Sequence, residues 1–379
     1  MLRQGQQGCY SCLALPVISC QTAVKRCHFM SEPPLPARRA TLEDVARAAG
    51  VSVSTVDRVM SLRANVRADT AQRIAEAAAQ LGFYGRNVIE QRLLQHRPVV
   101  RIGLLLQKRG VAFYQGLAKA LTDAAAASVR AQVRVMVGYI DDLDPAATAE
   151  RILALQHEID ALGVVAADHP AVAAAVAHLR AAGLPVIAMV SQLSAAAGAG
   201  YVGVDNRRMG RTAAWFITRL ARQPGAVAVM VGTQRFQCQE LCELSFRSCM
   251  TEQGPDWELL ATRLTLEDAA FAYAGTLDLL TSEPGLAGLY VGGGGIEGVI
   301  KALRECKARQ AVRPVVVCHD LTPLTRAALR EGVVDAVLSH PIEALAQATI
   351  NRLVQAAIKV PDESDSCLLP IQIDVPESA

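Results

Sequence analysis

The sequence predicts an all-α headpiece followed by a two-lobed α/β domain. Two short amphipathic helices joined by a glycine turn are expected within residues 41–60, and apolar runs alternate with alanine-rich helical segments from residue 100 onward. Strands that alternate with helices indicate parallel sheets with helices on both faces. The 379 residues, 51% of them hydrophobic, suffice for two or three domains and exclude a mainly disordered chain.

Residues 1–40 differ from the rest of the chain. They contain a short apolar stretch with Cys9, Cys12, Cys20 and Cys27. We expect a disordered leader, or translated upstream sequence whose true start is Met30. Two alternatives remain open. The residues before Cys20 resemble a bacterial lipoprotein cleavage box, and the cysteines with His28 could bind zinc, although a second pair with zinc-site spacing is missing.

Residues 41–82 carry the pattern of three short helices. The first opens with an N-cap threonine and acidic side chains, and Gly50 can adopt the left-handed conformation that ends a helix. Ser52 can cap a second helix over 53–60, and a third is expected over 68–81. Two short helices joined by a tight turn can place the second in the DNA major groove. An ordinary helical hairpin is the alternative.

A longer motif includes these first two helices. The segment matches the pattern D-V-A-x-x-A-G-V-S-x-x-T-V-x-R-V at Asp44, Val45, Ala46, Ala49, Gly50, Val51, Ser52, Thr55, Val56, Arg58 and Val59. It therefore resembles the helix-turn-helix headpiece of the lactose-repressor (LacI) family. The resemblance implies binding to double-stranded DNA at a pseudo-palindromic operator.

The resemblance also implies which side chains contact DNA. The base-reading positions of the family fall at Val53, Ser54 and Arg58. Its phosphate-facing positions fall at Leu42, Ser52, Thr55, Asn65 and Thr70. Asp57 departs from the usual serine, and a carboxylate near phosphates costs affinity unless it accepts a bond from cytosine or pairs with a cation. We expect Arg58 or Arg63 as its partner.

Residues 83–99 correspond to the hinge of the family, which inserts a leucine from each dimer partner into the minor groove. Gly85 replaces the usual proline, and Leu93 matches the wedge position only if one residue is inserted. We expect a hinge helix over 86–95, with Arg86, Asn87 and Arg92 near phosphates and Leu93 or Leu94 as the wedge. A plain linker helix is the alternative.

Residues 100–375 resemble the periplasmic-binding-protein-like (type I) domain of the family, a two-lobed effector-binding and dimerisation domain. The apolar runs lie at 102–106, 133–137, 162–166, 185–190, 201–204, 226–231, 286–291 and 314–318. Ligands of parallel sheets bind beyond the carboxyl ends of the strands. We therefore expect the effector in the cleft between the lobes.

Polar and aromatic residues after these runs are the candidates for effector binding. They are Phe113, Tyr114, Asp168, His169, Ser191, Glu240, Gly293, His319, Asp320 and His340. Asp320 and Glu240 lead, because carboxylates accept paired hydrogen bonds from adjacent hydroxyls while aromatic faces stack on a sugar. Relatives often carry an arginine at the position of Glu240, so its charge disfavours an anionic effector. A sugar or polyol is expected, and a cationic ligand or a purine stays open.

Several candidates have a purely structural alternative. Asp168 and Asp205 could simply cap the helices that follow them, and Phe113 could belong to the core. The glycine run at 292–295 lacks the Lys-Ser/Thr pair of a phosphate-binding loop. We expect it to let the backbone approach the ligand closely.

The sequence therefore predicts a cytoplasmic repressor, a homodimer or tetramer, controlled by a small effector and using no cofactor or metal. Residues 38–101 carry 11 basic and 6 acidic side chains, whereas the chain beyond them carries 24 and 29. This asymmetry indicates that the headpiece contacts phosphates.

No G-x-S-x-G, H-E-x-x-H or Walker motif is present, so no enzyme is expected. No apolar run is long enough for a membrane span. The alternative is an exported solute-binding lipoprotein of the same sensor fold.

Overall fold

The computed structural model describes residues 39–61, 66, 68–89, 97–306, 313–360 and 366–379. The chain divides into two units between Asn87 and Val88. The predictions for the leader, for Asn65 and for Leu93 lie outside the described residues.

The first unit is helical, as the sequence predicts. Its helices are α1 (Leu42–Ala49), α2 (Val53–Ser61) and α3 (Ala68–Gln80). Thr41 and Asp44 form a capping box at the start of α1, and Gly50 ends that helix at φ 65°. Val45, Val56 and Ile74, one from each helix, are fully buried and form the centre of the small core. Burial of these side chains fixes the turn between α1 and α2 and leaves the opposite face of α2 exposed.

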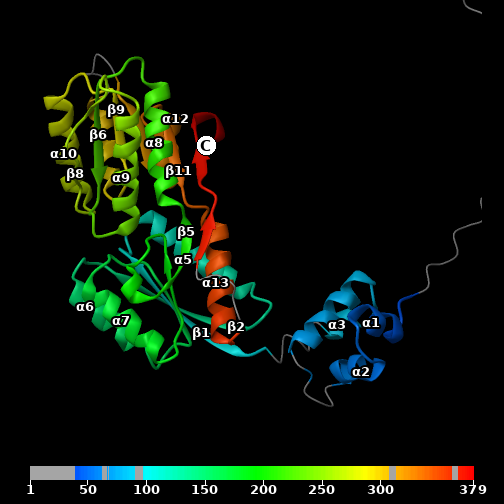
Figure 1. Ribbon diagram of the computed structural model, residues 1–379. Coiled ribbons are helices and arrows are strands. Elements are labelled where there is room, and N and C mark those ends of the chain that lie inside the picture. The colour runs from blue at the N-terminus through cyan, green and yellow to red at the C-terminus, as the bar shows by residue number, and fades with distance from the viewer. Residues whose placement is uncertain (1–38, 62–65, 67, 90–96, 307–312, 361–365) are drawn as a thin grey trace, which may run out of the picture. The chain divides into compact units, whose positions relative to one another are not determined.

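The second unit consists of two α/β lobes (Figure 1). The first lobe holds a six-stranded parallel sheet in the order β12-β5-β4-β3-β1-β2. Its strands are β1 (Val99–Gln107), β2 (Gln132–Ile140), β3 (Ala161–Val164), β4 (Val186–Met189), β5 (Gly200–Val204) and β12 (Ser366–Leu369). Helices α5 (Ala112–Ala126) and α13 (Ile342–Ala357) cover one face, and α6 (Pro145–Ala154) and α7 (Pro170–Ala181) cover the other.

The second lobe holds a seven-stranded sheet in the order β13-β11-β10-β9-β6-β7, with β8 paired to β6. Its strands are β6 (Ala226–Val231), β7 (Glu258–Leu259), β8 (Arg263–Leu264), β9 (Gly288–Val291), β10 (Val315–His319), β11 (Ala336–Ser339) and β13 (Gln372–Asp374). Helices α8 (Asn206–Leu220) and α9 (Gln237–Glu252) pack on one face, and α10 (Ala269–Ser282), α11 (Ile296–Cys306) and α12 (Pro323–Arg330) on the other.

The eight apolar runs all become strands, and the predicted doubly covered sheets are confirmed. The chain crosses between the lobes after β5, after β11 and after β12, so three segments of the chain join the lobes. Parallel pairing brings the carboxyl ends of the strands in each lobe to one edge. Among the described residues, no helix combines the length and apolarity needed to cross a bilayer.

Candidate DNA-reading helix and effector cleft

The N-terminus of α2 carries a cluster of hydroxyl groups. Ser52 caps the helix by accepting a hydrogen bond from the Thr55 amide at 3.3 Å. Its Oγ also lies 2.9 Å from Oγ of Ser54 and 2.8 Å from Oγ1 of Thr55. Hydroxyls and unpaired amides at a helix N-terminus bind phosphate oxygens. The local sequence thus places polar donors where the resemblance expects phosphate and base contacts.

The neighbouring side chains of α2 are exposed. Val53 is 41% exposed, although it is apolar, and Arg58 is exposed one helical turn further along the same helix. The expected pair between Asp57 and Arg58 is wrong, because no such contact forms between these two described side chains. Arg63, the other expected partner, lies outside the described residues. The carboxylate of Asp57 therefore stays exposed beside the helix.

The remaining headpiece candidates lie near this helix or at the end of the unit. Leu42 and Thr70 are half-buried at the starts of α1 and α3. Residues 86–89 are helical, and exposed Arg86 donates to the side-chain oxygen of Asn87 at 3.4 Å. The first turn of the expected hinge helix is therefore formed, while the wedge position lies outside the described residues.

In the second unit, Asp168 connects the two lobes. It follows β3, and its amide donates to the carbonyl of Arg235 in the second lobe at 2.7 Å. One carboxylate oxygen accepts from the Ser194 amide at 3.1 Å, and the other accepts from Nε2 of Gln237 at 3.0 Å. Both oxygens are thus occupied by protein donors. The structural alternative for Asp168, a cap of the next helix, is wrong, because the side chain that caps α7 is His169.

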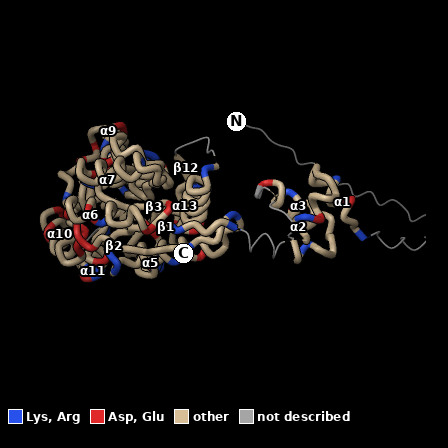
Figure 2. Tube along the Cα trace, turned by 90° about the horizontal axis from the view of Figure 1, so that it is seen from below, with Lys and Arg blue, Asp and Glu red and all other residues tan. Residues whose placement is uncertain are grey.

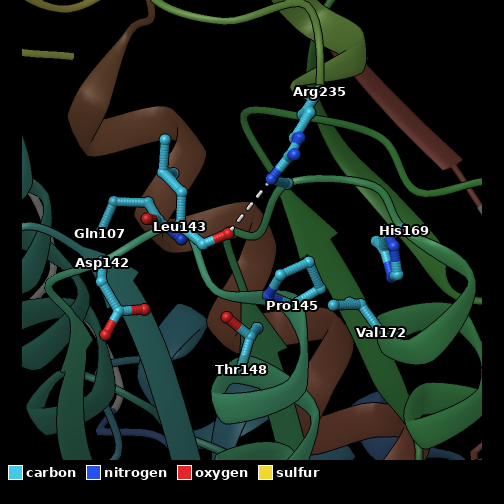
Figure 3. A pocket seen from close by; sticks show the side chains of 9 residues that line it. Gln107, Asp142, Leu143, Pro145, Thr148, His169, Val172 and Arg235 are labelled. Carbon is cyan, nitrogen blue, oxygen red and sulfur yellow. Dashed lines mark hydrogen bonds between the residues drawn. The ribbon is translucent and has the colours of Figure 1, made fainter. Parts of the chain in front are cut away.

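Further contacts join the lobes along the same edge. The Cys238 amide donates to Oγ of Ser191 at 3.3 Å, and Lys108 donates to the carbonyl of Glu267 at 2.7 Å. Arg235 reaches down to the Leu143 carbonyl at 3.5 Å across a small pocket that His169 also lines (Figure 3). This pocket has room for about 10 Å³, roughly one water molecule. It is too small for a sugar.

Asp320 and His340 form a polar pair just beyond the carboxyl ends of the neighbouring strands β10 and β11. Oδ1 of Asp320 accepts from the His340 amide at 3.1 Å and lies 2.9 Å from its Nδ1. Burial alone would raise the pKa of Asp320, but the charge and hydrogen bonds of His340 hold that pKa below its usual range. His340 is 5% exposed, and its Nε2 has no hydrogen-bond partner among the described residues.

His319 precedes this pair and differs from it in environment. Its Nε2 lies 2.7 Å from the hydroxyl of Tyr290, which is fully buried. Burial lowers the pKa of His319 to about 4, against the opposing charge of Asp320. The ring is therefore neutral near pH 7, and its Nε2 and the tyrosine hydroxyl share one hydrogen bond.

Phe113 and Tyr114 bring aromatic surface to the same place. The rings of Phe113 and His340 have centroids 5.8 Å apart, and Phe113 packs edge-on against Tyr114 at 5.0 Å. Phe113 is also part of the hydrophobic core of the first lobe. The pKa of Tyr114 is raised by burial and by the nearby charges of Glu267, Cys238 and Asp320.

The glycine run at 292–295 has a different role from the expected one. A Cβ on Gly294 or on Gly232 would overlap the carboxylate of Glu267, and a Cβ on Gly293 would overlap the amide of Gln239. The space beside these glycines is thus filled by two side chains of the protein. The expectation that the run itself opens the backbone to ligand is corrected by this packing.

Glu240 lies apart from these contacts, and Asp205 has a structural role. Glu240 is exposed on α9, one turn beyond the residues that contact the first lobe. Asp205 caps α8 through bonds to the Arg207 and Arg208 amides at 3.0 and 3.1 Å. The structural alternative for Asp205 is confirmed.

Sequence reasoning missed Glu267, Gln239, Gln237 and Lys108. Glu267 accepts from Nε2 of Gln239 at 2.7 Å and from the Gly294 amide at 3.3 Å. It follows the two-residue strand β8, which has no recognisable hydrophobic period. The glycine run at 292–295 was the signal available in the sequence. Four consecutive residues without side chains leave space beside the backbone that a side chain from another segment can occupy. In the described part of the chain, no cluster of three His, Cys, Asp or Glu could hold a metal.

Comparison with protein families matches both units. Residues 41–85 match the family described as bacterial regulatory proteins, lacI family, and residues 102–359 match the periplasmic binding protein domain. A maltose regulon regulatory protein, MalI, of Escherichia coli (strain K12) is 39% identical over 94 residues, which are 25% of this chain and 27% of that protein. The ribose operon repressor of Bacillus subtilis (strain 168) is 40% identical over 84 residues, 22% of this chain and 25% of that repressor. The matched segment thus spans about a quarter of each relative's length.

Solved structures resemble the second unit. An ABC transporter solute binding protein from Agrobacterium vitis with bound D-fucose has a TM-score of 0.67 at 16% identity, covering 73% of this chain and 96% of that chain. One from Bacillus halodurans C-125 with bound myo-inositol has a TM-score of 0.65 at 18% identity, covering 73% and 95%. At this identity the likeness shows the fold alone. Residues 102–359, which are more than half of the chain, match the periplasmic binding protein domain, so the chain belongs to that family, and its headpiece is similar to bacterial regulatory proteins of the lacI family.

Proposed function

We propose that this protein is a DNA-binding transcriptional repressor whose operator affinity is controlled by a sugar or polyol bound between the lobes of its second unit. The observation that carries the proposal is the combination in one chain of an exposed, hydroxyl-rich recognition helix with a two-lobed cleft that holds an Asp–His pair beside aromatic rings. A solute-binding protein has no need of the helix.

The headpiece supplies the chemistry for operator recognition. Val53, Ser54 and Arg58 on the exposed face of α2 read base edges, because an arginine can donate two bonds to guanine and an aliphatic group contacts the thymine methyl. The phosphate contacts come from Leu42, Ser52, Thr55, Asn65, Thr70, Arg86 and Asn87. Arginines on α1, α2 and α3 add favourable charge (Figure 2).

The cleft supplies the effector site. Asp320 and His340 accept or donate bonds to hydroxyls, while Phe113 and Tyr114 present apolar surface to a sugar ring. A ligand that contacts both lobes favours one angle between them, and this differential affinity is what changes operator binding. The named relatives, a maltose regulon regulator and a ribose operon repressor, support a sugar as the effector.

The protein acts as a homodimer, or a tetramer built from dimers, in the cytoplasm, where its DNA lies. One recognition helix reads only a few base pairs, so two subunits on the half-sites of a pseudo-palindrome are needed for useful affinity and specificity. Each subunit contributes a hinge leucine, Leu93 by the family pattern.

The test is operator selection from random duplex DNA, followed by titration of the selected duplex with and without sugars and polyols. We expect a pseudo-palindromic sequence to be enriched, and at least one compound to change its affinity by roughly 5- to 150-fold, the usual range of allosteric coupling. Failure to enrich any sequence would contradict the proposal. Enrichment without a responsive compound would remove only the sugar or polyol effector.

A further inference from the structure

One carboxylate lies on the exposed face of α2. Val56 on the opposite face is fully buried, so only the exposed face of this helix is available to another molecule. Asp57 is exposed four positions after Val53 and three after Ser54, and these spacings put side chains on the same side of an α-helix. Arg58, the next residue, is exposed as well. A duplex that contacts the proposed base-reading residues of α2 therefore also meets the carboxylate of Asp57.

The carboxylate of Asp57 has no partner in the described part of the headpiece. In the same helix, Oγ of Ser61 donates to the main-chain carbonyl of Asp57 at 2.6 Å, not to its side chain. The hydroxyl of Ser54, one turn earlier, lies 2.9 Å from the hydroxyl of Ser52 instead. Among the described residues, no lysine or arginine forms an ion pair with Asp57. Within that part of the chain, both carboxylate oxygens are thus available as acceptors.

The base edges of a duplex offer a carboxylate few partners. A carboxylate only accepts hydrogen bonds, so it needs a donor on the edge of a base. In the major groove, guanine presents two acceptors and thymine one, and adenine presents its donor beside the acceptor N7. Cytosine alone presents a donor, its N4 amino group, with no acceptor on the same edge. A carboxylate in the major groove therefore selects cytosine.

A position beside the phosphates suits Asp57 less well. A carboxylate that faced the DNA backbone would be repelled by the phosphate charges and would weaken binding to every sequence equally. The start of α2 already presents the hydroxyls of Ser52 and Thr55, which suit phosphate oxygens. Asp57 lies five positions after Ser52 and beside Arg58, whose guanidinium can donate two bonds to guanine. The hydroxyls thus suit the backbone, and the step from Asp57 to Arg58 suits base edges.

We propose that Asp57 is a specificity-determining residue of α2, which accepts a hydrogen bond from the N4 amino group of a cytosine in each operator half-site. Consecutive Cα atoms are about 3.8 Å apart, close to the rise of roughly 3.4 Å per base pair. The cytosine therefore lies at the base pair read by Arg58 or at its neighbour. This inference rests on the proposed function, since it requires α2 to read the operator.

Operator selection from random duplex DNA, with the full wild-type chain and with the variant Asp57→Asn, tests the inference. Asparagine has nearly the size of aspartate, but its amide offers a donor and an acceptor, which suits N6 and N7 of adenine. We expect the wild type to select cytosine at one position of each half-site and Asp57→Asn to lose that preference in favour of adenine. In titrations, the wild type should prefer the cytosine operator over the doubly adenine-substituted one by at least about tenfold.

Asp69→Asn removes the same charge from an exposed residue of α3 and is the matched control, which should leave base selection unchanged. A thermal melt checks that both variants keep the fold. An Asp57→Asn profile identical to that of the wild type overturns the inference, even if affinity rises for every sequence, because the carboxylate then faces a phosphate or another side chain. A wild-type profile without cytosine at the position that changes also overturns it.

The two outcomes that overturn the inference leave the proposed function intact, because the wild type would still have selected an operator. Failure of the wild type to enrich any sequence contradicts the proposed function itself, and base reading by Asp57 with it.

Discussion

The carboxylate of Asp168 joins the two lobes by accepting from Nε2 of Gln237 at 3.0 Å while its other oxygen accepts from the Ser194 amide at 3.1 Å. Asp168 belongs to the first lobe and Gln237 begins α9 of the second. A charged acceptor with two donors is worth more than a neutral one. Asp168 therefore contributes a charge-assisted hydrogen bond to the contact between the lobes.

Asp168→Ala is predicted to loosen this contact. Bonds to a charged group contribute about 1.5–3 kcal/mol, so amides near 190–194 and 233–240 should exchange hydrogen at least about tenfold faster in the variant. Hydrogen-exchange mass spectrometry measures both segments. Asp123→Ala, which removes an exposed carboxylate paired with Lys119 on α5, is the control and should change nothing. Equal exchange in wild type and Asp168→Ala would show that the lobes are held elsewhere.

His319 is predicted to make the second unit less stable in mild acid. Its pKa is lowered by burial to about 4 in the fold from the ordinary value of 6.5, so the unfolded chain binds the proton first as pH falls. The free energy of unfolding should therefore decrease between pH 6.5 and 4, by about 2 kcal/mol from this group at pH 5 relative to pH 7.

His319→Gln tests that prediction, since glutamine does not titrate and can still accept from Tyr290. Urea unfolding followed by tryptophan fluorescence reports on the second lobe, because Trp215 and Trp257 both lie there. The loss of stability between pH 7 and 5 should be smaller in the variant by about 2 kcal/mol. The same pH dependence in both proteins would mean that His319 is protonated in the native state.

Gly294→Ala is predicted to displace Glu267. The new Cβ would overlap that carboxylate, so we expect a loss of about 1–2 kcal/mol in unfolding free energy, typical of overpacking. In a Glu267→Ala background the same substitution should cost less than about 0.5 kcal/mol, which a double-mutant cycle measures. Gly110→Ala, where no atom lies within 4 Å of the new Cβ, is the control. Equal costs in both backgrounds would contradict the packing of Glu267 against this glycine.

Local pattern was enough to predict most of the fold. The strand at 226–231 was predicted at its observed bounds, and Thr41 and Gly50 marked the limits of α1 because capping depends on neighbours in sequence. The short strands β7 and β8 and the late strands β12 and β13 were missed. Two to four residues give no period to detect, and β13 pairs with residues 33 to 37 positions earlier in the chain.

The cleft could be predicted only where residues follow strands directly. Asp320 and His340 were expected separately, and the structure shows that they meet because β10 and β11 are parallel neighbours. Glu267 could not be found in this way, because its position depends on left-handed backbone at two consecutive non-glycine residues. Glu240 was favoured as an effector-binding residue because of its place on the helix after β6. The sequence does not show which side of α9 meets the first lobe; in the structure Cys238 contacts that lobe, and Glu240 is exposed.

The most direct test of the account is the affinity of the Arg58→Ala variant for a selected operator. Arg58 is exposed on α2, and loss of one base contact from each half-site should cost about 2–6 kcal/mol, or at least about thirtyfold in affinity. Arg47→Ala, which removes an exposed arginine from α1, is the matched control and should lose far less. Fluorescence anisotropy with a labelled duplex measures both. A strong loss confined to Arg58→Ala is predicted; unchanged affinity in that variant would contradict operator reading by α2.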